Sequence, residues 1–401
     1  MAEAASRPQG LRRAVTIASA ALAVFAGACV GRREPPREQR PEARPEPARP
    51  VERPDEGPPT LIPRDEARNK VAVLVPLSGP NAGVGTSIAN AANLALLDSG
   101  ETSIRITVYD TAQGAAVAAN AALTDGNRLF LGPLTAEDVR AIAPIARRAG
   151  VPVIAFSNDA SVAGDGTYIM GFTPDQSIER AVRHARDKGA VRFAGLVPDG
   201  VYGQRASQAL IGSVERNGGR MVAMQGFNRA PASLGAAARA LNARTGFDAV
   251  VIADSGRIAA AAAPLIRSGP SRGAHVIGTE LWSTDDTLGK SPALRGAWFA
   301  GVADMRFDQL VTRYRARYRK TPYRLASLGY DGVLLAVRIS RDWDIGARFP
   351  ERRLTDRDGF SGVDGAFRFR RDGTAERMMA IHAVTTGGTT IVSPAATGFS
   401  D

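Results

Sequence analysis

The fold is decided by two stretches, Leu129-Phe-Leu-Gly-Pro-Leu-Thr-Ala-Glu-Asp-Val139 and Gly150-Val-Pro-Val-Ile-Ala-Phe-Ser-Asn158. Each contains a short apolar run that ends in polar and turn-forming residues. Between them, residues 136–149 repeat apolar positions at helical spacing. A buried strand, an amphipathic helix and a second buried strand predict a β-α-β unit of a parallel sheet.

The same alternation continues on both sides of this unit. Before it we expect strands at 71–75 and 104–109 and helices at 88–97 and 115–123. After it we expect helices at 178–188 and 205–216 and strands at 193–197, 221–224, 249–252 and 275–277. A break near Gly171–Pro174 divides the two series. The sequence therefore predicts an α/β protein of two Rossmann-like lobes with parallel sheets.

The last hundred residues are expected to return to the first lobe and then close the second. The chain is predicted to re-cross near Trp298–Asp304, with helices at 307–318 and 325–343 and closing strands at 359–369 and 379–384. The predicted two-lobed domain spans 69–395. Its first lobe covers about 69–172 and 300–343, and its second about 173–299 and 344–395.

The N-terminal 28 residues have the pattern of a secretory signal peptide. Arginines precede an apolar run from Ala14 to Ala26, which is too short to span a bilayer stably. Small residues then lead to Cys29, the single cysteine, and this arrangement resembles the bacterial lipobox, although that motif prefers Leu where Ala26 stands. We expect cleavage and lipidation at Cys29, which would anchor the chain to a membrane. An ordinary secretion signal with an incidental cysteine and an uncleaved anchor helix are the alternatives.

Residues 29–68 are predicted to be a disordered tether behind the lipidated cysteine. The segment holds ten prolines between Pro35 and Pro63, nine arginines and nine acidic residues, with almost nothing apolar. Such a composition cannot bury enough surface to fold. An extended, proline-rich chain of this length could reach on the order of 100 Å.

The basic composition does not indicate a nucleic-acid partner. The formal net charge is +11, but export removes that partner, and no arginines interleave with stacking aromatics as in RNA-binding sheets. The densest basic run is Arg313–Lys320 on a predicted helix. It is interpreted as a solvated face, with a docking surface for an acidic partner, lipid headgroups or a cell-wall polymer as the alternative.

Nothing in the sequence specifies catalysis, a metal or a cofactor. The loop Ser78–Thr86 has Gly85 where a phosphate-binding loop needs lysine, and it lacks the three-glycine spacing of a dinucleotide site. His184, His275 and His382 are far apart in sequence, and no nucleophile elbow occurs. We therefore expect a non-enzymatic protein with no metal ion and no cofactor.

Several segments resemble the type 1 periplasmic-binding superfamily, which includes leucine-binding proteins. The resemblance covers roughly residues 70–390. It is carried by the two stretches quoted first and by Val73–Pro80, Met170–Pro174, Tyr202-Gly203 and Gly329–Asp331. It implies a type 1 periplasmic-binding fold, in which three crossing segments form a hinge and two lobes close over a ligand.

Within that superfamily, amino-acid importers bind the ligand carboxylate with a hydroxyl residue after the Gly-x-x turn and with Ser-Pro after the fourth strand. This chain has Thr135 followed by Ala136 and Glu137, and it has Ala155-Phe156 where Ser-Pro is usual. Glu137 is expected to repel a carboxylate and Phe156 to occupy ligand space. The remaining candidates for a polar cleft are Ser78, Thr135, Ser157, Asn158 and Tyr202.

The Gly-Pro-Leu turn at Gly132, the Val-Ile-Ala-Phe-Ser-Asn strand end and Gly-Phe-Thr-Pro-Asp at Gly171 are more similar to lipoprotein activators of penicillin-binding proteins. This resemblance implies a lipid-anchored envelope protein, with the outer membrane favoured, that promotes peptidoglycan synthesis by contacting a penicillin-binding protein. The alternative is a solute-binding protein of an ABC importer for amino acids or a related small polar ligand. The best-known activators carry a helical-repeat domain where this chain has its tether.

Overall fold

The computed structural model describes residues 68–243, 246–285, 287–302 and 305–399. The expected signal peptide, Cys29 and nearly all of the expected tether lie outside the described residues.

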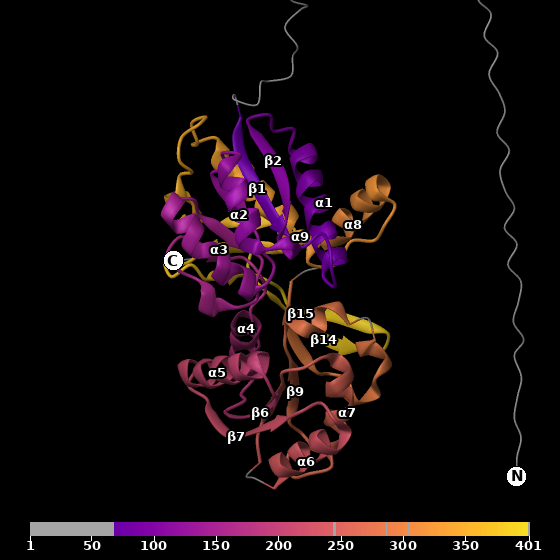
Figure 1. Cartoon of the computed structure of the whole chain (residues 1–401). Helices are drawn as coiled ribbons and strands as arrows, with labels where there is room; N and C mark the ends of the chain where they lie inside the picture. The colour runs from indigo at the N-terminus through magenta and orange to yellow at the C-terminus, as the bar shows by residue number, and fades with distance from the viewer. Residues whose placement is uncertain (1–67, 244–245, 286, 303–304, 400–401) are drawn as a thin grey trace, which may run out of the picture. The chain divides into compact units, whose positions relative to one another are not determined.

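Lobe 1 is built on a five-stranded, fully parallel sheet with the order β2-β1-β3-β4-β5 (Figure 1). Its strands are β1 Asn69–Val75, β2 Ile104–Asp110, β3 Leu129–Leu131, β4 Val153–Ala155 and β5 Thr167–Ile169. Its helices are α1 Ala82–Ser99, α2 Ala115–Thr124, α3 Ala136–Ala149, α8 Met305–Tyr318 and α9 Ala326–Ser340. The two stretches that predicted the β-α-β unit form β3, α3 and β4, as expected.

The first of those stretches requires glycine at position 132, directly after β3, for two reasons. The φ of Gly132 is 102°, a left-handed conformation that side chains disfavour. A Cβ at this position would also lie 2.1 Å from the carbonyl oxygen of Leu74 on β1. Glycine therefore lets the turn after β3 pass directly beside the end of the neighbouring strand.

Lobe 2 contains a seven-stranded sheet with the order β15-β14-β10-β9-β8-β6-β7. The five strands from β10 to β7 run parallel, and β14 and β15 are antiparallel additions at one edge. The strands are β6 Arg192–Pro198, β7 Arg220–Phe227, β8 Ala249–Ile252, β9 His275–Gly278, β10 Trp298–Gly301, β14 Ala380–Thr385 and β15 Gly388–Ser393. The helices are α4 Pro174–Asp187, α5 Val201–Arg216, α6 Pro231–Asn242 and α7 Gly256–Arg267.

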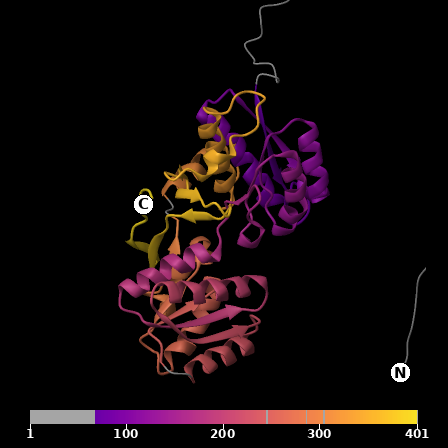
Figure 2. The ribbon, with the colours of Figure 1, turned by 90° about the vertical axis from the view of Figure 1, so that its left-hand side faces the viewer.

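A small antiparallel sheet corrects the expected lobe boundary. It consists of β11 Phe360–Gly362, β12 Gly365–Phe369 and β13 Ala375–Arg377. We expected residues 344–395 to belong to the second lobe. Instead, Phe349, Phe360 and Phe367 pack in the same buried cluster as β1 and α1, so this sheet belongs to lobe 1. Figure 2 shows these late segments, in orange and yellow, beside the indigo strands of lobe 1.

Three segments connect the lobes, as the resemblance implied. They follow β5, β10 and β13, and each leads into an element of the other lobe: α4, α8 and β14, respectively. The α/β fold with two Rossmann-like lobes is therefore confirmed. Helices α6 and α7 and strands β5, β13 and β15 were not expected from the sequence.

Short 3₁₀ helices complete the described chain: η2 Thr111–Gln113, η3 Ala160–Val162, η4 Glu280–Thr284, η5 Leu288–Lys290, η6 Pro292–Leu294 and η7 Glu351–Thr355. Among the described residues, no helix is both long and apolar enough to cross a membrane.

Candidate functional site: the cleft between the lobes

A cavity of about 440 Å³ lies between the two lobes and against the segments that cross between them. Open α/β sheets bind ligands beyond the carboxyl ends of their parallel strands, and residues of this cavity follow β4, β9 and β10. Its lining is mainly apolar with a few polar groups, which is typical of a small-molecule site. The lining residues are Asn81, Val84, Leu134, Thr135, Phe156, Asn158, Phe172, Glu280, Leu281, Ser283, Gly301, Val302, Arg324, Leu325 and Met379.

The lobe 1 wall contains three of the residues singled out from the sequence: Thr135, Phe156 and Asn158. Thr135 is the N-cap of α3, and its hydroxyl accepts the N–H of Asp138 at 3.1 Å. This contact satisfies one of the unpaired N–H groups at the helix start. Phe156 is buried and lines the cleft directly after β4, so the expectation that it occupies space in the cleft is consistent with its position.

The lobe 2 wall contributes a carboxylate that the sequence reasoning missed. Glu280 begins η4 directly after β9, and its Oε1 accepts a hydrogen bond from the Tyr202 hydroxyl at 2.9 Å. Its Oε2 accepts a hydrogen bond from the Ser177 hydroxyl at 2.5 Å. Burial raises the pKa of Glu280 despite these two donors. Burial also raises the pKa of Tyr202, and the neighbouring Glu280 charge adds to the effect.

A buried group of two arginines and two aspartates stands behind the cleft in lobe 1. Arg324, which lines the cavity, pairs with Asp364 at 2.6 Å between Nη1 and Oδ1. Asp331 accepts the N–H of Val363 at 2.7 Å, and burial together with the charge of Asp364 raises the pKa of Asp331 to about 7. Arg377 donates to the carbonyl oxygen of Met170 at 3.0 Å. This last bond ties the end of β13 to the first crossing segment.

One ion pair bridges the lobes beside the cleft. Asp159 of lobe 1 is fully buried and pairs with Arg205 of α5 in lobe 2, as well as with Arg140 of α3. Burial alone would raise the pKa of Asp159, but hydrogen bonds from Ser161 and the two guanidinium charges outweigh it and lower that pKa. The charged pair therefore links the lobes in the arrangement observed here.

The other residues expected at the cleft have different surroundings. Ser78 donates to Asp110 Oδ2 at 2.9 Å, and Ser157 is buried and accepts the N–H of Asp159 at 3.1 Å. Tyr202 reaches the cleft wall only through Glu280. Glu137 is exposed in the first turn of α3 and is not a lining residue. The expectation that Glu137 faces a ligand in the cleft is therefore wrong for this arrangement, because its side chain leaves the helix toward solvent.

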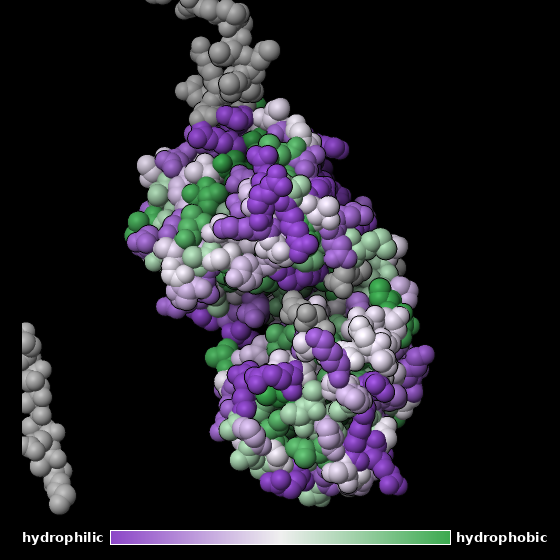
Figure 3. Space-filling view, turned by 90° about the vertical axis from the view of Figure 1, so that its right-hand side faces the viewer, coloured by the Kyte–Doolittle hydropathy of each residue, from purple (hydrophilic) through white to green (hydrophobic). Residues whose placement is uncertain are grey.

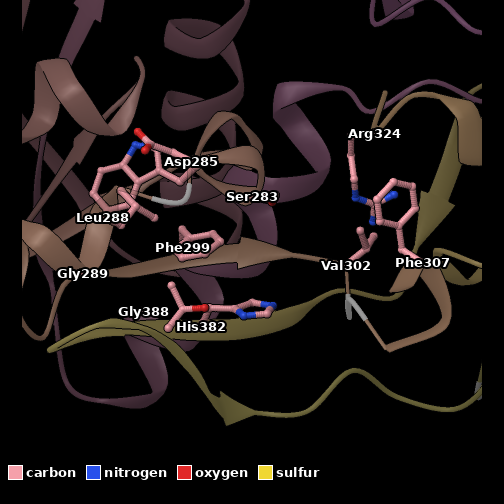
Figure 4. A pocket seen from close by; sticks show the side chains of 12 residues that line it. Ser283, Asp285, Leu288, Gly289, Phe299, Val302, Phe307, Arg324, His382 and Gly388 are labelled. Atoms are coloured by element: carbon pink, nitrogen blue, oxygen red, sulfur yellow. The ribbon is translucent and has the colours of Figure 1, made fainter. Parts of the chain in front are cut away.

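A second cavity of about 450 Å³ adjoins the first and shares Ser283, Val302 and Arg324 with it. Figure 4 shows the guanidinium of Arg324 along the ring of Phe307, with the Arg324 Cζ 4.1 Å from the ring centroid. On the opposite side, Phe299 and His382 stack with ring centroids 5.0 Å apart. The cavity thus combines aromatic walls with a cation that already has an acidic partner.

Two of the three histidines meet around one tryptophan, although they are far apart in sequence. His275 stacks on Trp298 with ring centroids 4.2 Å apart, and His184 meets it edge-on at 4.9 Å. Burial lowers the pKa of His184. Within the described part of the chain, no group of three or more histidine, cysteine or acidic residues is arranged to hold a metal ion.

Comparison with known proteins extends over most of this domain. A family profile described as periplasmic binding protein matches residues 69–389. The uncharacterised protein RP748 of Rickettsia prowazekii is 26% identical over 153 residues, which are 38% of this chain. The match spans 41% of that relative's length.

Solved structures show the same fold at low sequence identity. One is a putative branched-chain amino acid ABC transporter protein from Rhodospirillum rubrum, with a TM-score of 0.70 and 20% identity; the match covers 81% of this chain and all of that one. Another is the C-domain of LpoA from Haemophilus influenzae, described as a regulator of PBP1A. It has a TM-score of 0.64 and 18% identity, with 81% of this chain and all of that one covered.

Proposed function

This chain belongs to the periplasmic binding protein family, and from that premise we propose that it is a lipid-anchored activator of a penicillin-binding protein. In this proposal it is non-catalytic and promotes peptidoglycan synthesis by direct protein contact. Membership of the family implies a location on the periplasmic side of the cell envelope. The lipid at Cys29 and the outer membrane as its location are part of the proposal.

The observation that carries the proposal is the lobe 1 wall of the cleft, where the aromatic ring of Phe156 takes up space that a small ligand would need. Arg324 is the one cation among the described lining residues. Its Nη1 pairs with Asp364, while its Nε and Nη2 have no hydrogen-bond partner among the described residues. Phe156 lines the cleft near the position where importers of this superfamily carry Ser-Pro, and Glu280 adds a carboxylate to the opposite wall. The Phe156 ring and the Glu280 carboxylate therefore both disfavour a free amino acid in this cleft, the first by its bulk and the second by repelling the ligand carboxylate.

A second candidate, a solute-binding protein of an ABC importer, is favoured by the Glu280 group. A carboxylate held by Tyr202 and Ser177 at the edge of a 440 Å³ cavity could accept hydrogen bonds from an ammonium group. The apolar residues around it could hold the body of the same ligand. The solved structures with this fold include both importer proteins and the LpoA regulator, and identities of this size indicate the fold alone.

Thermal unfolding with added amino acids separates the two candidates. We expect no shift with millimolar leucine, valine or other common amino acids. A ligand present at about 100 times its Kd should add roughly 2.7 kcal/mol to the free energy of unfolding. A rise of several degrees that is lost in Glu280→Gln would overturn the activator proposal in favour of solute binding.

Direct contact is tested with purified peptidoglycan synthases of the same organism. We expect one of them to bind this chain and to synthesise peptidoglycan faster in its presence. Glu280→Gln is the matched control here as well, because it should leave contact unchanged if the cleft has no part in it. Absence of binding to every synthase would contradict the proposal.

The anchor is tested separately by mass spectrometry of the mature protein. We expect a lipid mass on an N-terminal Cys29, and we expect Cys29→Ser to abolish it. A wild-type N-terminus without lipid would remove the anchor from the proposal and leave the contact test unaffected.

A further inference from the structure

The end of α8 carries a cluster of cations with no acidic residues nearby in sequence. Residues 309–330 include no aspartate or glutamate, but they contain Arg313, Arg315, Arg317, Arg319, Lys320 and Arg324. Arg313 pairs with Asp98, and Arg324 with Asp364. Arg315 bonds to the hydroxyl of Thr321.

The three remaining cations, Arg317, Arg319 and Lys320, are exposed, and none is paired with an acidic residue among those described. Arg317 contacts only the neighbouring Tyr318, with its Cζ 5.9 Å from the ring centroid. We call these three residues the α8 basic cluster. Figure 3 faces the side of the molecule on which α8 lies in Figure 1, and long hydrophilic side chains gather over lobe 1 there.

Helix packing accounts for the position of this cluster. The buried residues of α8 are Leu310 and Tyr314, and the Tyr318 hydroxyl donates to the carbonyl oxygen of Asn90 on α1. These residues, together with Arg306 and Arg313, hold the helix on lobe 1, so the α8 basic cluster is not needed for its packing. Cations in the last turn of a helix also stabilise its dipole, but Arg319 and Lys320 lie beyond the last residue of α8, so this effect does not explain them.

We propose that the α8 basic cluster docks the domain on a bilayer surface rich in anionic phospholipids. Guanidinium and ammonium groups bind phosphate well, and a cluster of basic residues is attracted to an anionic leaflet. Tyr323 lies three residues after Lys320 and is 55% exposed, and tyrosine side chains favour the headgroup region of a membrane. No apolar helix face needs to insert, so docking is electrostatic and reversible.

The expected tether supports a membrane as the partner of the α8 basic cluster. This part of the argument depends on the proposed lipid anchor at Cys29. An extended, proline-rich chain from Cys29 to Arg68 could reach on the order of 100 Å, so the domain would stay within about that distance of the bilayer. Tethering at this range raises the effective concentration of the domain at the membrane. Weak docking would then be sufficient to alternate between a membrane-held and a released domain.

The test is sedimentation of the processed chain, residues 29–401, with large unilamellar vesicles. All proteins carry Cys29→Ser, so that no lipid contributes. We expect binding to vesicles of equal parts phosphatidylglycerol and phosphatidylcholine, none to pure phosphatidylcholine, and loss of binding at about 0.5 M salt. The variant R317E/R319E/K320E should bind at least tenfold more weakly.

The matched control is R239E/R257E/R272E, which makes the same change in net charge on lobe 2, where these arginines are also exposed. It should keep its binding to within about twofold. Equal losses in both variants would attribute binding to net charge alone and overturn the proposal, as would failure of the wild type to bind the anionic vesicles. Unchanged melting temperatures verify folding, and R317A/R319A/K320A replaces any variant that fails this check.

Binding to a peptidoglycan synthase is measured on the same variants. Normal synthase binding with lost vesicle binding supports a separate membrane surface. Loss of synthase binding with vesicle binding retained would show that the α8 basic cluster contacts a protein, and it would overturn the inference without affecting the proposed activator function.

Discussion

The two lobes begin in the same way and are completed differently. The first strand of each lobe is buried and leads into Leu-Val-Pro. Pro76 directly follows β1 in lobe 1, and Pro198 is the last residue of β6, which follows helix α4 in lobe 2. In each, a glycine in the first turns of the next helix presses against that proline. A Cβ on Gly85 would lie 1.8 Å from the Pro76 carbonyl oxygen, and one on Gly203 would lie 1.6 Å from the Pro198 carbonyl oxygen.

The two lobes differ in how their sheets are completed. Lobe 2 obtains its five parallel strands from a single stretch, residues 192–301, and adds β14 and β15 at one edge. Lobe 1 covers its parallel sheet with α8, α9 and the small sheet β11–β13, which arrive after the chain has passed through lobe 2. The same local strand-to-helix contact therefore supports two different ways of closing a core.

The largest expected effect tests the shared strand-to-helix contact. Gly85→Ala and Gly203→Ala should each lower the free energy of unfolding by about 3 kcal/mol, because the new methyl group must displace a backbone carbonyl. Urea denaturation measures the effect. Gly235→Ala in α6 is the control, since its Cβ would meet only the flexible tip of Arg239 at 3.4 Å, and it should be neutral or stabilising by up to about 1 kcal/mol. A large loss at only one of the two sites would break the similarity between the lobes.

The second prediction concerns lobe 1 alone: its stability should depend on pH through Asp331. The pKa of Asp331 is raised to about 7 by burial and by Asp364, whereas an unfolded aspartate titrates near 3.9. The folded protein therefore holds this proton more tightly, and the stability that it contributes is lost as the pH rises from about 4 through 7. We expect wild-type stability to fall by about 2 kcal/mol from this group between pH 5 and 7.

Asp331→Asn should flatten that slope, measured as the midpoint of urea denaturation at each pH. Arg324, Arg377 and Asp364 face the same interior, so their substitution would change the slope for a different reason and is not a substitute test. An identical slope in wild type and Asp331→Asn would show that Asp331 is charged in the folded protein throughout this range.

The smallest effect tests the connection between the lobes. Arg205→Ala should cost roughly 1 kcal/mol, because Asp159 is buried but keeps Arg140 as a partner. It should also increase the radius of gyration in small-angle scattering, since the ion pair spans both lobes. The matched control is Arg147→Ala, whose pair with Asp165 is exposed on both sides and should contribute less than about 0.5 kcal/mol. Equal changes in both variants would remove the special role of the inter-lobe pair.

The alternating architecture could be predicted because buried parallel strands such as β1, β3 and β4 are uninterrupted apolar runs. Sheet β11–β13 was assigned to the wrong lobe because its strands are short and its aromatic residues fit either core. The lobe of that sheet depends on long-range packing. Helix α7 was missed although its buried positions follow helical spacing, because Pro264 interrupts its run of alanines.

The cleft was predicted in part for a similar reason. Thr135, Phe156 and Asn158 follow strands at the sheet edge, and their position could be inferred from the strand pattern. Glu280 follows β9 in the same way, so its position after a predicted strand was an available signal. The inter-lobe partner of Asp159 could not be inferred, because the crossing segments and not local sequence bring Arg205 to it.

The late arrival of α9 has a consequence for how the protein is made. Residues of α9 pack in the same buried cluster as β1 and α1. Just beyond α9, the carbonyl oxygen of Trp343 accepts a hydrogen bond from Asn69, 274 positions earlier. The first strand of the domain is therefore among the last to be covered. Until α9 is available, the apolar surface that it covers stays open, whereas the parallel strands of lobe 2 are complete at residue 301. Nascent chains that stop before α9 should therefore depend on holding chaperones and aggregate through lobe 1 when these are scarce.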